Sequence, residues 1–327
     1  MRRRQFITAT VLPLAATLPG AARAQSTGAW PARTVRIIVP FGPGSTPDIL
    51  ARLVADRMTQ SLGQSFIVEN KAGAGGSIGT LAVARAPADG YTIGLSITGP
   101  LVNNTILYSK MAYDPFRDLA PVTLAAVQPS VLAVSPSLNV NSVAELMALL
   151  RANPGKYNYA SLGAGTVAHL AMELIKARSG TYIVHIPYPS SPAAVTSILA
   201  GDTQMGTLPP AAVMPQVRAG KLRALAVTTG QRYALLAELP TFREAGIPDV
   251  EASAWLGFVV PSGVPAPLVE QLNRELVAAL REPEVADKLR AQYMQPMPGT
   301  PKEFADFMQA ELRRWTPVIQ RAGVRLD

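Results

Sequence analysis

The chain has 327 residues, of which 48% are hydrophobic and 16% charged, a composition typical of a globular protein. It contains no cysteine and only two histidines, which excludes disulfides, thiolate metal sites, iron–sulfur clusters and cysteine nucleophiles. The length suits one large domain or two medium ones. We therefore expect a folded protein without a metal centre or a cofactor.

Residues 1–24 have the features of a bacterial export signal. A basic start is followed by the apolar run Phe6–Leu18, and a small-x-small cleavage site ends at Ala24. The apolar run has 13 residues, too few to span a membrane. The pair Arg3-Arg4 also fits a twin-arginine signal, so Sec and twin-arginine export both remain open. Either route predicts a periplasmic protein.

Removal of this signal takes away four arginines and no acidic residue, so the formal net charge falls from +8 to +4. The remaining chain has no cluster of lysine and arginine, and we expect no nucleic-acid partner. No later stretch holds roughly 18 uninterrupted apolar residues. The mature protein is therefore expected to be released from the membrane.

The first part of the chain repeats one pattern, in which an apolar run, a glycine-rich turn and a helical period follow one another. The predicted elements are a strand at 34–41, a helix at 47–62, a strand at 66–69, a loop at 73–76, a helix through 81–83 and a strand at 91–97. Strands that alternate with helices predict parallel α/β sheets.

A second series follows two extended runs that flank Gln128-Pro129. The predicted elements are helices at 142–151, 166–177 and 193–200, and strands at 157–160, 182–186, 222–228 and 254–260. A C-terminal helix begins at a capping box of Thr300 and Glu303, with Pro301 at its first position. Its apolar residues recur at helical spacing and predict a buried face. Two α/β lobes fit this pattern best.

Two strand–glycine–helix junctions are candidate anion sites. One runs from Phe41 to Asp48 with Thr46 as the expected N-cap, and the other from Ser161 to Thr166 with Thr166 as the N-cap. Free N–H groups at a helix start bind an anion without a cationic side chain, and glycine lets a ligand approach the backbone. Together the junctions could hold two carboxylates of one small molecule. Tight, capped turns without a ligand are the alternative.

The second junction also contains the dinucleotide pattern Gly163-x-Gly165-x-x-Ala168. That pattern needs an acidic residue about 20 positions later, and none occurs between 174 and 201. We therefore expect no nucleotide cofactor.

The sequence contains no group of residues with the types and spacing of a known catalytic site. Ser161 does not lie in a G-x-S-x-G elbow, and no acid is evidently placed to orient His169. His169 and His185 are interpreted as packing residues. An exported hydrolase that uses Ser161 and His169 remains the alternative function.

Ordered motifs along the whole mature chain resemble the Bug family, the solute receptors of tripartite tricarboxylate transporters. The matching segments are 30–44, 68–79, 89–92, 113–118, 154–159, 169–171, 185–188, 220–228 and 240–246, with Trp315 and Gly323 near the end. The resemblance implies a two-lobed periplasmic binding protein of type II, with the ligand in the interlobe cleft. It places 26–128 and 229–327 in lobe I and 129–228 in lobe II.

The same resemblance implies a binding protein and not an enzyme. Its ligand would be a small organic acid such as a di- or tricarboxylate, an acidic amino acid or an aromatic acid, and its partner a membrane permease. A ligand sensor that docks on a membrane kinase is a further alternative. The first-lobe loop of the family maps to Phe41, Pro43, Gly44, Ser45 and Asp48, and the second-lobe loop to Ser161, Gly163, Gly165, Thr166 and His169. Further candidate ligand contacts are Thr46, Thr98, Tyr188, Gln204 and Thr207.

Several positions depart from the family pattern. Ser45 replaces a second glycine, Pro189-Ser190 replaces a Lys-Gly pair, Gln204 replaces an acid and Thr207 an aromatic residue. Loss of an acid favours anionic ligands, whereas loss of a lysine disfavours them. These effects oppose one another, so the sequence does not name the acid.

Overall fold

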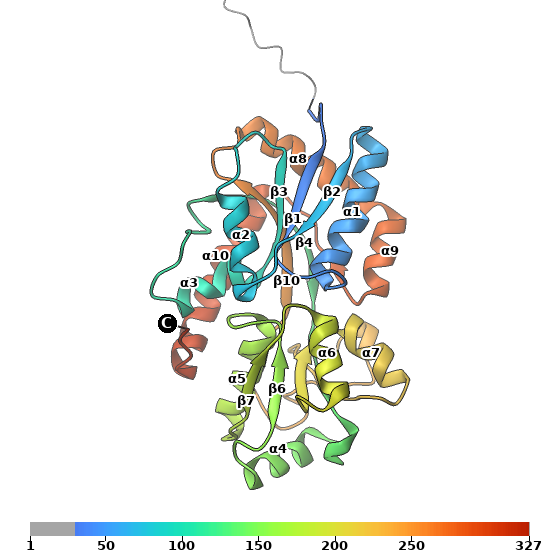
Figure 1. Ribbon diagram of the computed structural model, residues 1–327, viewed down its shortest axis with the longest axis vertical. Helices are drawn as coiled ribbons and strands as arrows, with labels where there is room; N and C mark the ends of the chain where they lie inside the picture. The colour runs from blue at the N-terminus through green and yellow to red at the C-terminus, as the bar shows by residue number, and fades with distance from the viewer. Residues whose placement is uncertain (1–29, 327) are drawn as a thin grey trace, which may run out of the picture.

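The computed structural model describes residues 30–326, and the export signal predicted at 1–24 lies outside the described residues. The chain forms two lobes that follow one another along the long axis of the molecule (Figure 1). Each lobe has one β-sheet with helices on both faces. Within 30–326 we find no helix with the length and apolarity needed to cross a bilayer.

The sheet of lobe I has six strands in the order β11-β4-β10-β3-β1-β2. The strands are β1 Val35–Val39, β2 Phe66–Asn70, β3 Thr92–Ile97, β4 Leu119–Gln128, β10 Ala254–Pro261 and β11 Gln295–Pro296. β1 is parallel to β2 and β3, as predicted, but β10 is antiparallel to β3 and β4. The sheet is therefore mixed, because β10 enters from the other lobe and runs against its neighbours.

The sheet of lobe II has five strands in the order β7-β6-β8-β5-β9. The strands are β5 Val131–Val134, β6 Asn158–Ser161, β7 Val184–Pro187, β8 Met205–Leu208 and β9 Arg223–Val227. β6 is parallel to β7 and β8, whereas β5 is antiparallel to β8 and β9. This sheet is also mixed, since β5 carries the chain away from lobe I. The carboxyl ends of β1 and β6 consequently face the opposite lobe.

Helices cover both faces of each sheet. They are α1 Thr46–Leu62, α2 Ser77–Ala84, α3 Asn104–Leu107, α4 Val143–Ala152, α5 Val167–Ser179, α6 Ser191–Ala200, α7 Pro210–Arg218, α8 Ala266–Arg281, α9 Pro283–Ala291 and α10 Pro301–Ala322. In lobe I, α1, α8 and α9 share one hydrophobic cluster, and α2 and α10 share another. In lobe II, α4 and α5 cover one face and α6 and α7 the other. A π-helical segment, Gly99–Asn103, precedes α3.

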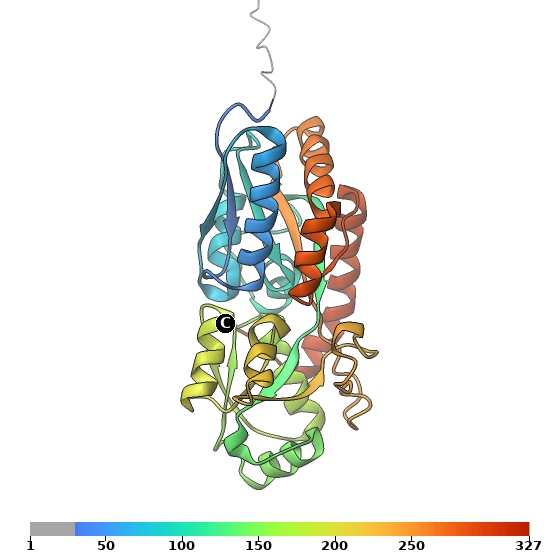
Figure 2. The ribbon, with the colours of Figure 1, turned by 90° about the vertical axis from the view of Figure 1, so that its right-hand side faces the viewer.

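The last helix connects the two lobes. α10 starts at the predicted capping box of Thr300 and Glu303, in which both reciprocal hydrogen bonds form. Phe304 packs in a cluster of lobe I, whereas Trp315 packs in the cluster beneath α4 and α5 of lobe II. The red helix in Figure 2 therefore runs alongside both lobes.

The segment before β10 also packs on lobe II. Phe242, Ile247 and Val250 belong to the hydrophobic cluster of α4 and α5. Packing thus places the second crossing between Ala252 and Ala254, whereas the predicted boundary lies at residue 229. The reason is that this segment has no strand of its own in the lobe I sheet and covers apolar surface of lobe II instead.

Replacement of Trp315 by alanine is expected to lower the free energy of unfolding by about 3–5 kcal/mol. The side chain is 1% exposed, and its indole Nε1 donates to Glu311 Oε2 at 3.2 Å, so the change leaves a cavity and removes one of the two indole hydrogen bonds to this oxygen. Urea denaturation of the mature protein measures the loss. Arg313→Ala, at an exposed position of the same helix, is the control and should cost less than about 0.5 kcal/mol. Equal losses in both variants would contradict the bridging role of Trp315.

Candidate functional site

The two lobes meet backbone to backbone at the carboxyl ends of their strands. On lobe I the contact is made by the short 3₁₀ turn Ala74–Gly76 after β2, and on lobe II by the turn between β6 and α5. A Cβ on Gly75 would lie under 3.0 Å from the Ala164 carbonyl oxygen, and one on Gly163 would lie 2.9 Å from Gly75 Cα. No side chain larger than hydrogen fits at either position while the lobes are in contact.

Three further contacts join the lobes around this point. The Gly42 N–H donates to the Pro189 carbonyl oxygen at 3.3 Å. The Leu162 side chain packs against hydrophobic clusters of both lobes. A Cβ on Gly165 would clash with Asn104 Oδ1. The cleft is therefore closed around the turn between β6 and α5.

Thr166 caps α5, as the sequence predicts. Its Oγ1 accepts from the His169 N–H at 3.4 Å and donates to the Gly163 carbonyl oxygen at 2.7 Å. The proton of this hydroxyl is therefore used inside the turn. A hydrogen bond from the Thr166 hydroxyl to a ligand carboxylate does not fit this arrangement, because a serine or threonine hydroxyl has only one proton.

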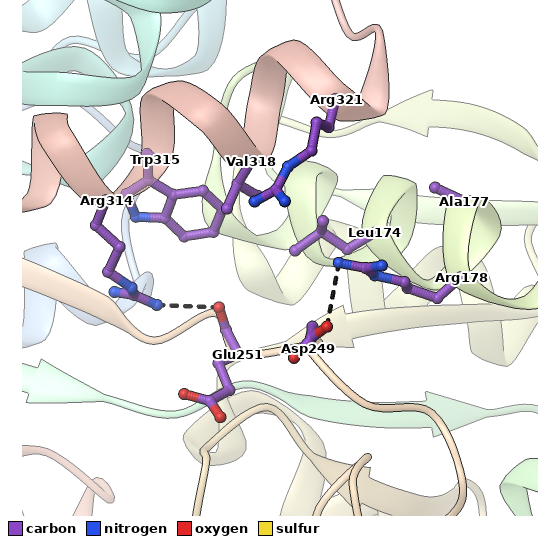
Figure 3. Close-up of a pocket in the computed structure, with 9 residues that line it drawn as sticks. All are labelled: Leu174, Ala177, Arg178, Asp249, Glu251, Arg314, Trp315, Val318 and Arg321. Atoms are coloured by element: carbon purple, nitrogen blue, oxygen red, sulfur yellow. Dashed lines mark hydrogen bonds and ion pairs between the residues drawn. The ribbon is translucent and has the colours of Figure 1, made fainter.

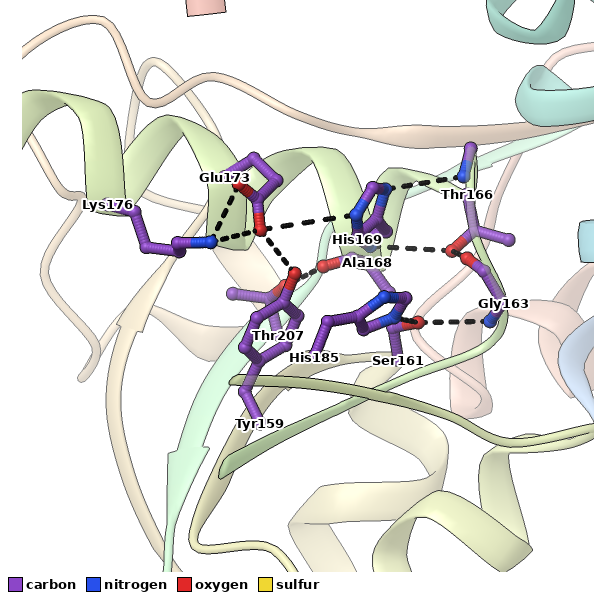
Figure 4. A network of polar contacts seen from close by, with 11 residues as sticks. Tyr159, Ser161, Gly163, Thr166, Ala168, His169, Glu173, Lys176, His185 and Thr207 are labelled. Carbon is purple, nitrogen blue, oxygen red and sulfur yellow. Dashed lines mark hydrogen bonds and ion pairs between the residues drawn. The ribbon is translucent and has the colours of Figure 1, made fainter. Parts of the chain in front are cut away.

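Ser161 ends β6 and is fully buried. Its Oγ lies 2.5 Å from His185 Nε2 and accepts from the Gly163 N–H at 3.0 Å (Figure 4). Among residues 30–326 no hydrogen bond joins His169 to Ser161, and His169 Nδ1 accepts instead from the Gly165 N–H at 3.3 Å. The Ser161/His169 pair of the hydrolase alternative is therefore not formed.

A network of buried and half-buried polar side chains lies behind Ser161. Tyr159 Oη and Lys176 Nζ donate to Glu173 Oε1 at 2.5 and 2.7 Å, and His169 Nε2 lies 4.0 Å from the same oxygen. The His185 ring stacks on Tyr159 and lies 4.4 Å from the His169 ring. Burial, together with the neighbouring His169, lowers the pKa of His185 to about 4. Burial also lowers the pKa of His169. Both rings are consequently neutral at neutral pH.

The junction between β1 and α1 is fixed by Asp48. Its carboxylate accepts from the Gly44 N–H at 2.9 Å, from Arg52 Nη2 at 2.9 Å and from Asn70 Nδ2 at 2.9 Å. Burial alone would raise the pKa of Asp48, but the hydrogen bonds from Arg52, Gly44 and Asn70 outweigh it and hold the pKa below its usual value. Asp48 therefore organises the loop, and the Gly44 N–H that was expected to hold a ligand is already bonded.

The N-cap of α1 is Ser45 and not Thr46, which is the first helical residue. Ser45 Oγ donates to the Gly42 carbonyl oxygen at 2.6 Å and makes no capping hydrogen bond. The helix therefore begins one residue earlier than predicted, and Pro47 is its second residue and not its first. Phe41 is buried, and its ring would be 3.0 Å from a Cβ on Gly76, at the end of the turn that contacts lobe II, so its contact with a ligand stays a prediction.

Three of the remaining predicted residues lie near the two junctions. Thr98 and Thr207 are buried near the junctions, but their hydroxyls bond the backbone of Trp255 and Ala168. The Tyr188 N–H donates to the Ser161 carbonyl oxygen at 2.9 Å, which places Tyr188 beside the second junction.

Gln204 lies apart from the other predicted site residues, and its contact with a ligand is not supported by its position. Its side chain accepts from the Asn158 N–H at 2.8 Å and donates to the Gly201 carbonyl oxygen at 2.7 Å. Asn158 begins β6 and Ser161 ends it, so Gln204 lies at the opposite end of the strand from the candidate site. The side chain replaces missing backbone contacts at the strand start.

The sequence reasoning missed two buried asparagines in lobe I. Asn104 Nδ2 donates to Ser77 Oγ at 2.8 Å, and its Oδ1, which faces Gly165, has no partner among the described residues. Asn103 is also fully buried, and neither of its side-chain polar atoms is hydrogen-bonded within 30–326. Buried amides without partners indicate a bound water or ligand. The sequence feature that could have identified them is a pair of adjacent asparagines within the apolar run 101–107.

A cavity of about 270 Å³ opens where α1 approaches α6 and α7. Its lining is Gly44, Thr46, Ile49, Ser191, Pro192, Val195, Thr196, Leu199, Ala211, Ala212 and Gln216. None of these side chains is charged. Ser191 Oγ is buried there and has no partner in the described part of the chain.

A pocket of about 480 Å³ lies between α5 and α10, about three turns of α5 away from Thr166 (Figure 3). Three arginines line it, but each has a partner. Arg178 pairs with Asp249 at 3.3 Å, Arg314 donates to the Glu251 carbonyl oxygen at 3.1 Å, and Arg321 Nε donates to the Pro317 carbonyl oxygen at 3.0 Å. Each of these arginines is therefore already occupied by an ion pair or a hydrogen bond within the protein. Within 30–326, no three His, Asp or Glu side chains are grouped to hold a metal ion.

The model of the family described as "Tripartite tricarboxylate transporter family receptor" (TctC) matches residues 50–324. The chain belongs to this family. Among curated TctC relatives, Protein BugT of Bordetella pertussis is 37% identical over 308 residues, which are 94% of each chain.

Two solved structures resemble the chain over nearly its whole described length. "R. palustris Rpa4515 with adipate" has a TM-score of 0.87 and 37% identity, and covers 90% of this chain and 99% of its own. MatC (Rpa3494) from Rhodopseudomonas palustris with bound malate has a TM-score of 0.84 and 29% identity, and covers 89% and 100%. The fold of this TctC-family chain is that of the periplasmic binding proteins.

Proposed function

We propose that the protein is a non-catalytic periplasmic receptor that closes its lobes on a small organic carboxylate and delivers it to a membrane permease. The observation that carries the proposal is the direct contact of Gly75 with Gly163 and Ala164, which seals the start of α5 inside the molecule. A ligand that touches both lobes favours this closed arrangement over an open one. Membership of the TctC family and the carboxylates in the solved relatives agree with it.

In this proposal one carboxylate lies at the start of α5. It accepts hydrogen bonds from the Ser161 hydroxyl and from the N–H groups of Val167 and Ala168, which have no carbonyl partner four residues earlier in the helix. The rest of the ligand extends towards Thr46 and the uncharged cavity beneath α6 and α7. A second carboxylate would meet no cation in that lining and would bind through water or neutral donors.

The hydrolase alternative is less well supported. His185 is the histidine that contacts Ser161, and among residues 30–326 its other ring nitrogen has no carboxylate partner. A catalytic base needs such a partner to hold its tautomer. The kinase-sensor alternative uses the same pocket, and only the membrane partner distinguishes it from the permease.

A thermal-shift screen of the mature protein, starting at Gln25, tests the function. The panel contains di- and tricarboxylates, acidic amino acids and aromatic acids. A ligand at 100 times its dissociation constant stabilises the folded state by about 2.7 kcal/mol and raises Tm by several degrees. We expect at least one acid to do so. A flat response, followed by mass spectrometry of the unfolded protein that finds no released acid, would contradict the proposal.

The arginine-lined pocket provides the control for the position of the site. Arg321→Ala removes a cation from that pocket and should leave the Tm shift unchanged. Ser161→Ala should reduce it strongly, because the hydroxyl faces the proposed carboxylate. The opposite pattern would place the ligand between α5 and α10.

A further inference from the structure

We propose that His185 sets the direction of the hydrogen bonds of Ser161, and thereby makes the site select an ionised carboxylate over a group that donates hydrogen bonds. The inference rests on the proposed function, in which Ser161 is a ligand contact. It assigns to His185 a positioning role that acts through Ser161, without contact between the histidine and the ligand.

Ser161 Oγ has two hydrogen-bond partners among the described residues of the protein. A serine hydroxyl has one proton to donate and two lone pairs that accept. The Gly163 N–H, at 3.0 Å, takes one lone pair. His185 Nε2, at 2.5 Å, takes either the second lone pair or the proton. The proton or lone pair of Ser161 Oγ that is left over is the one available to the ligand.

The tautomer of His185 decides which group remains. If Nε2 carries the proton, His185 donates to Ser161 Oγ and the serine proton is free for a ligand oxygen. If Nδ1 carries it, Ser161 must donate to Nε2, and only a lone pair is left. The first state favours a carboxylate, whereas the second favours an ammonium or hydroxyl group.

The surroundings of His185 favour the proton on Nε2. The ionisable groups around its ring are Tyr159 from β6 and His169, Glu173 and Lys176 from α5. Tyr159 and Lys176 both donate to Glu173, and no described residue accepts a hydrogen bond from His185 Nδ1. With a carboxylate on Ser161, a proton on Nε2 leaves both donors paired, because Nε2 donates to Ser161 Oγ and the serine hydroxyl donates to the ligand. A proton on Nδ1 has no acceptor among the described residues.

A bound carboxylate also changes the charge state of the histidine. In the free protein, burial beside His169 lowers the pKa of His185 to about 4. An anion one hydrogen bond away favours the imidazolium form and raises this pKa in the complex. Affinity is then highest at low pH and is lost as pH rises through the raised value. Imidazolium keeps the proton on Nε2, so the direction of the hydrogen bond stays the same.

Long-range ¹H–¹⁵N NMR of the mature protein with labelled histidine tests the tautomer directly. His185→Gln identifies the signal by its disappearance. We expect neutral His185 to show the Nε2–H pattern at pH 7 when a carboxylate is bound. An Nδ1–H pattern in the complex would overturn the proposal, whereas failure of every acid to bind would overturn the proposed function instead.

Variants of His185 test selection, with adipate as the carboxylate probe and hexane-1,6-diamine as the matched donor probe. His185→Gln keeps an N–H donor near the place of Nε2, and adipate should bind within about 3-fold of the unmodified protein. His185→Leu removes the donor and should weaken adipate binding by about 10-fold or more. Diamine binding should be undetectable in the unmodified protein.

The pH profile separates positioning from a merely structural role. Relative to His185→Gln, the unmodified protein should gain affinity for adipate as pH falls from 8 to 5, because glutamine cannot take up a proton. Titration of the ligand itself cancels in this comparison. Equal losses in the glutamine and leucine variants, or parallel pH profiles, would overturn the proposal. If adipate does not bind, the acid that gives the largest thermal shift replaces it in all of these measurements.

Discussion

Gly75→Ala is expected to weaken ligand binding by about 100-fold or more while both lobes stay folded. The added Cβ would lie under 3.0 Å from the Ala164 carbonyl oxygen, and a backbone atom cannot rotate out of the way. The lobes must separate to relieve this overlap. A 100-fold loss of affinity corresponds to about 2.7 kcal/mol, which is the free energy of lobe closure that the variant is expected to lose.

The matched control is Gly63→Ala. Gly63 has φ +67 and Gly75 has φ +60, so both substitutions strain the backbone similarly, but a Cβ on Gly63 meets nothing within 4 Å. Small-angle scattering and calorimetry, with the acid that gives the largest thermal shift, measure the two effects together. Gly75→Ala should have a larger radius of gyration than the control. A compact variant with normal affinity would show that this contact does not govern closure.

Local signals in the sequence predicted much of the fold. Thr166 caps α5, and Thr300 with Glu303 forms the capping box of α10, because these interactions span only three residues. The alternation of strands and helices likewise predicted two α/β lobes. The antiparallel strands were missed, since nothing in the apolar runs of β5 and β10 reports their direction.

The candidate site was predictable in position but not in its hydrogen bonds. Both junctions were expected from glycines and caps, and both lie at the interlobe contact. Ser161 and His185 are 24 residues apart, and their bond depends on the parallel register of β6 and β7. Register between strands is a tertiary property that a single sequence does not reveal. The same holds for Gln204, whose place at the far end of β6 follows from the sheet order.

Gly165→Ala is expected to reduce affinity nearly as strongly as Gly75→Ala. The new Cβ would overlap Asn104 Oδ1 and lie 3.2 Å from Leu107 Cδ1, so closure requires Asn104 to rotate and give up its hydrogen bond to Ser77. Gly180→Ala at the end of the same helix is the control, since its φ is +63 and a Cβ there meets nothing within 4 Å. Gly44→Ala should have a smaller effect, because its nearest neighbour, Pro192 Cγ, is 3.4 Å away.

A second substitution in lobe I separates the clash from the backbone strain. Asn104→Ala removes the overlapping atom, so affinity in the double variant Gly165→Ala/Asn104→Ala should exceed that of Gly165→Ala alone. Calorimetry of all four proteins gives the coupling energy, which we expect to be about 1–3 kcal/mol. Additive losses would mean that Gly165 acts only through its left-handed backbone, with φ +78, and not through contact with lobe I. A positive coupling would instead identify the Gly165–Asn104 contact as part of the closed, ligand-binding state.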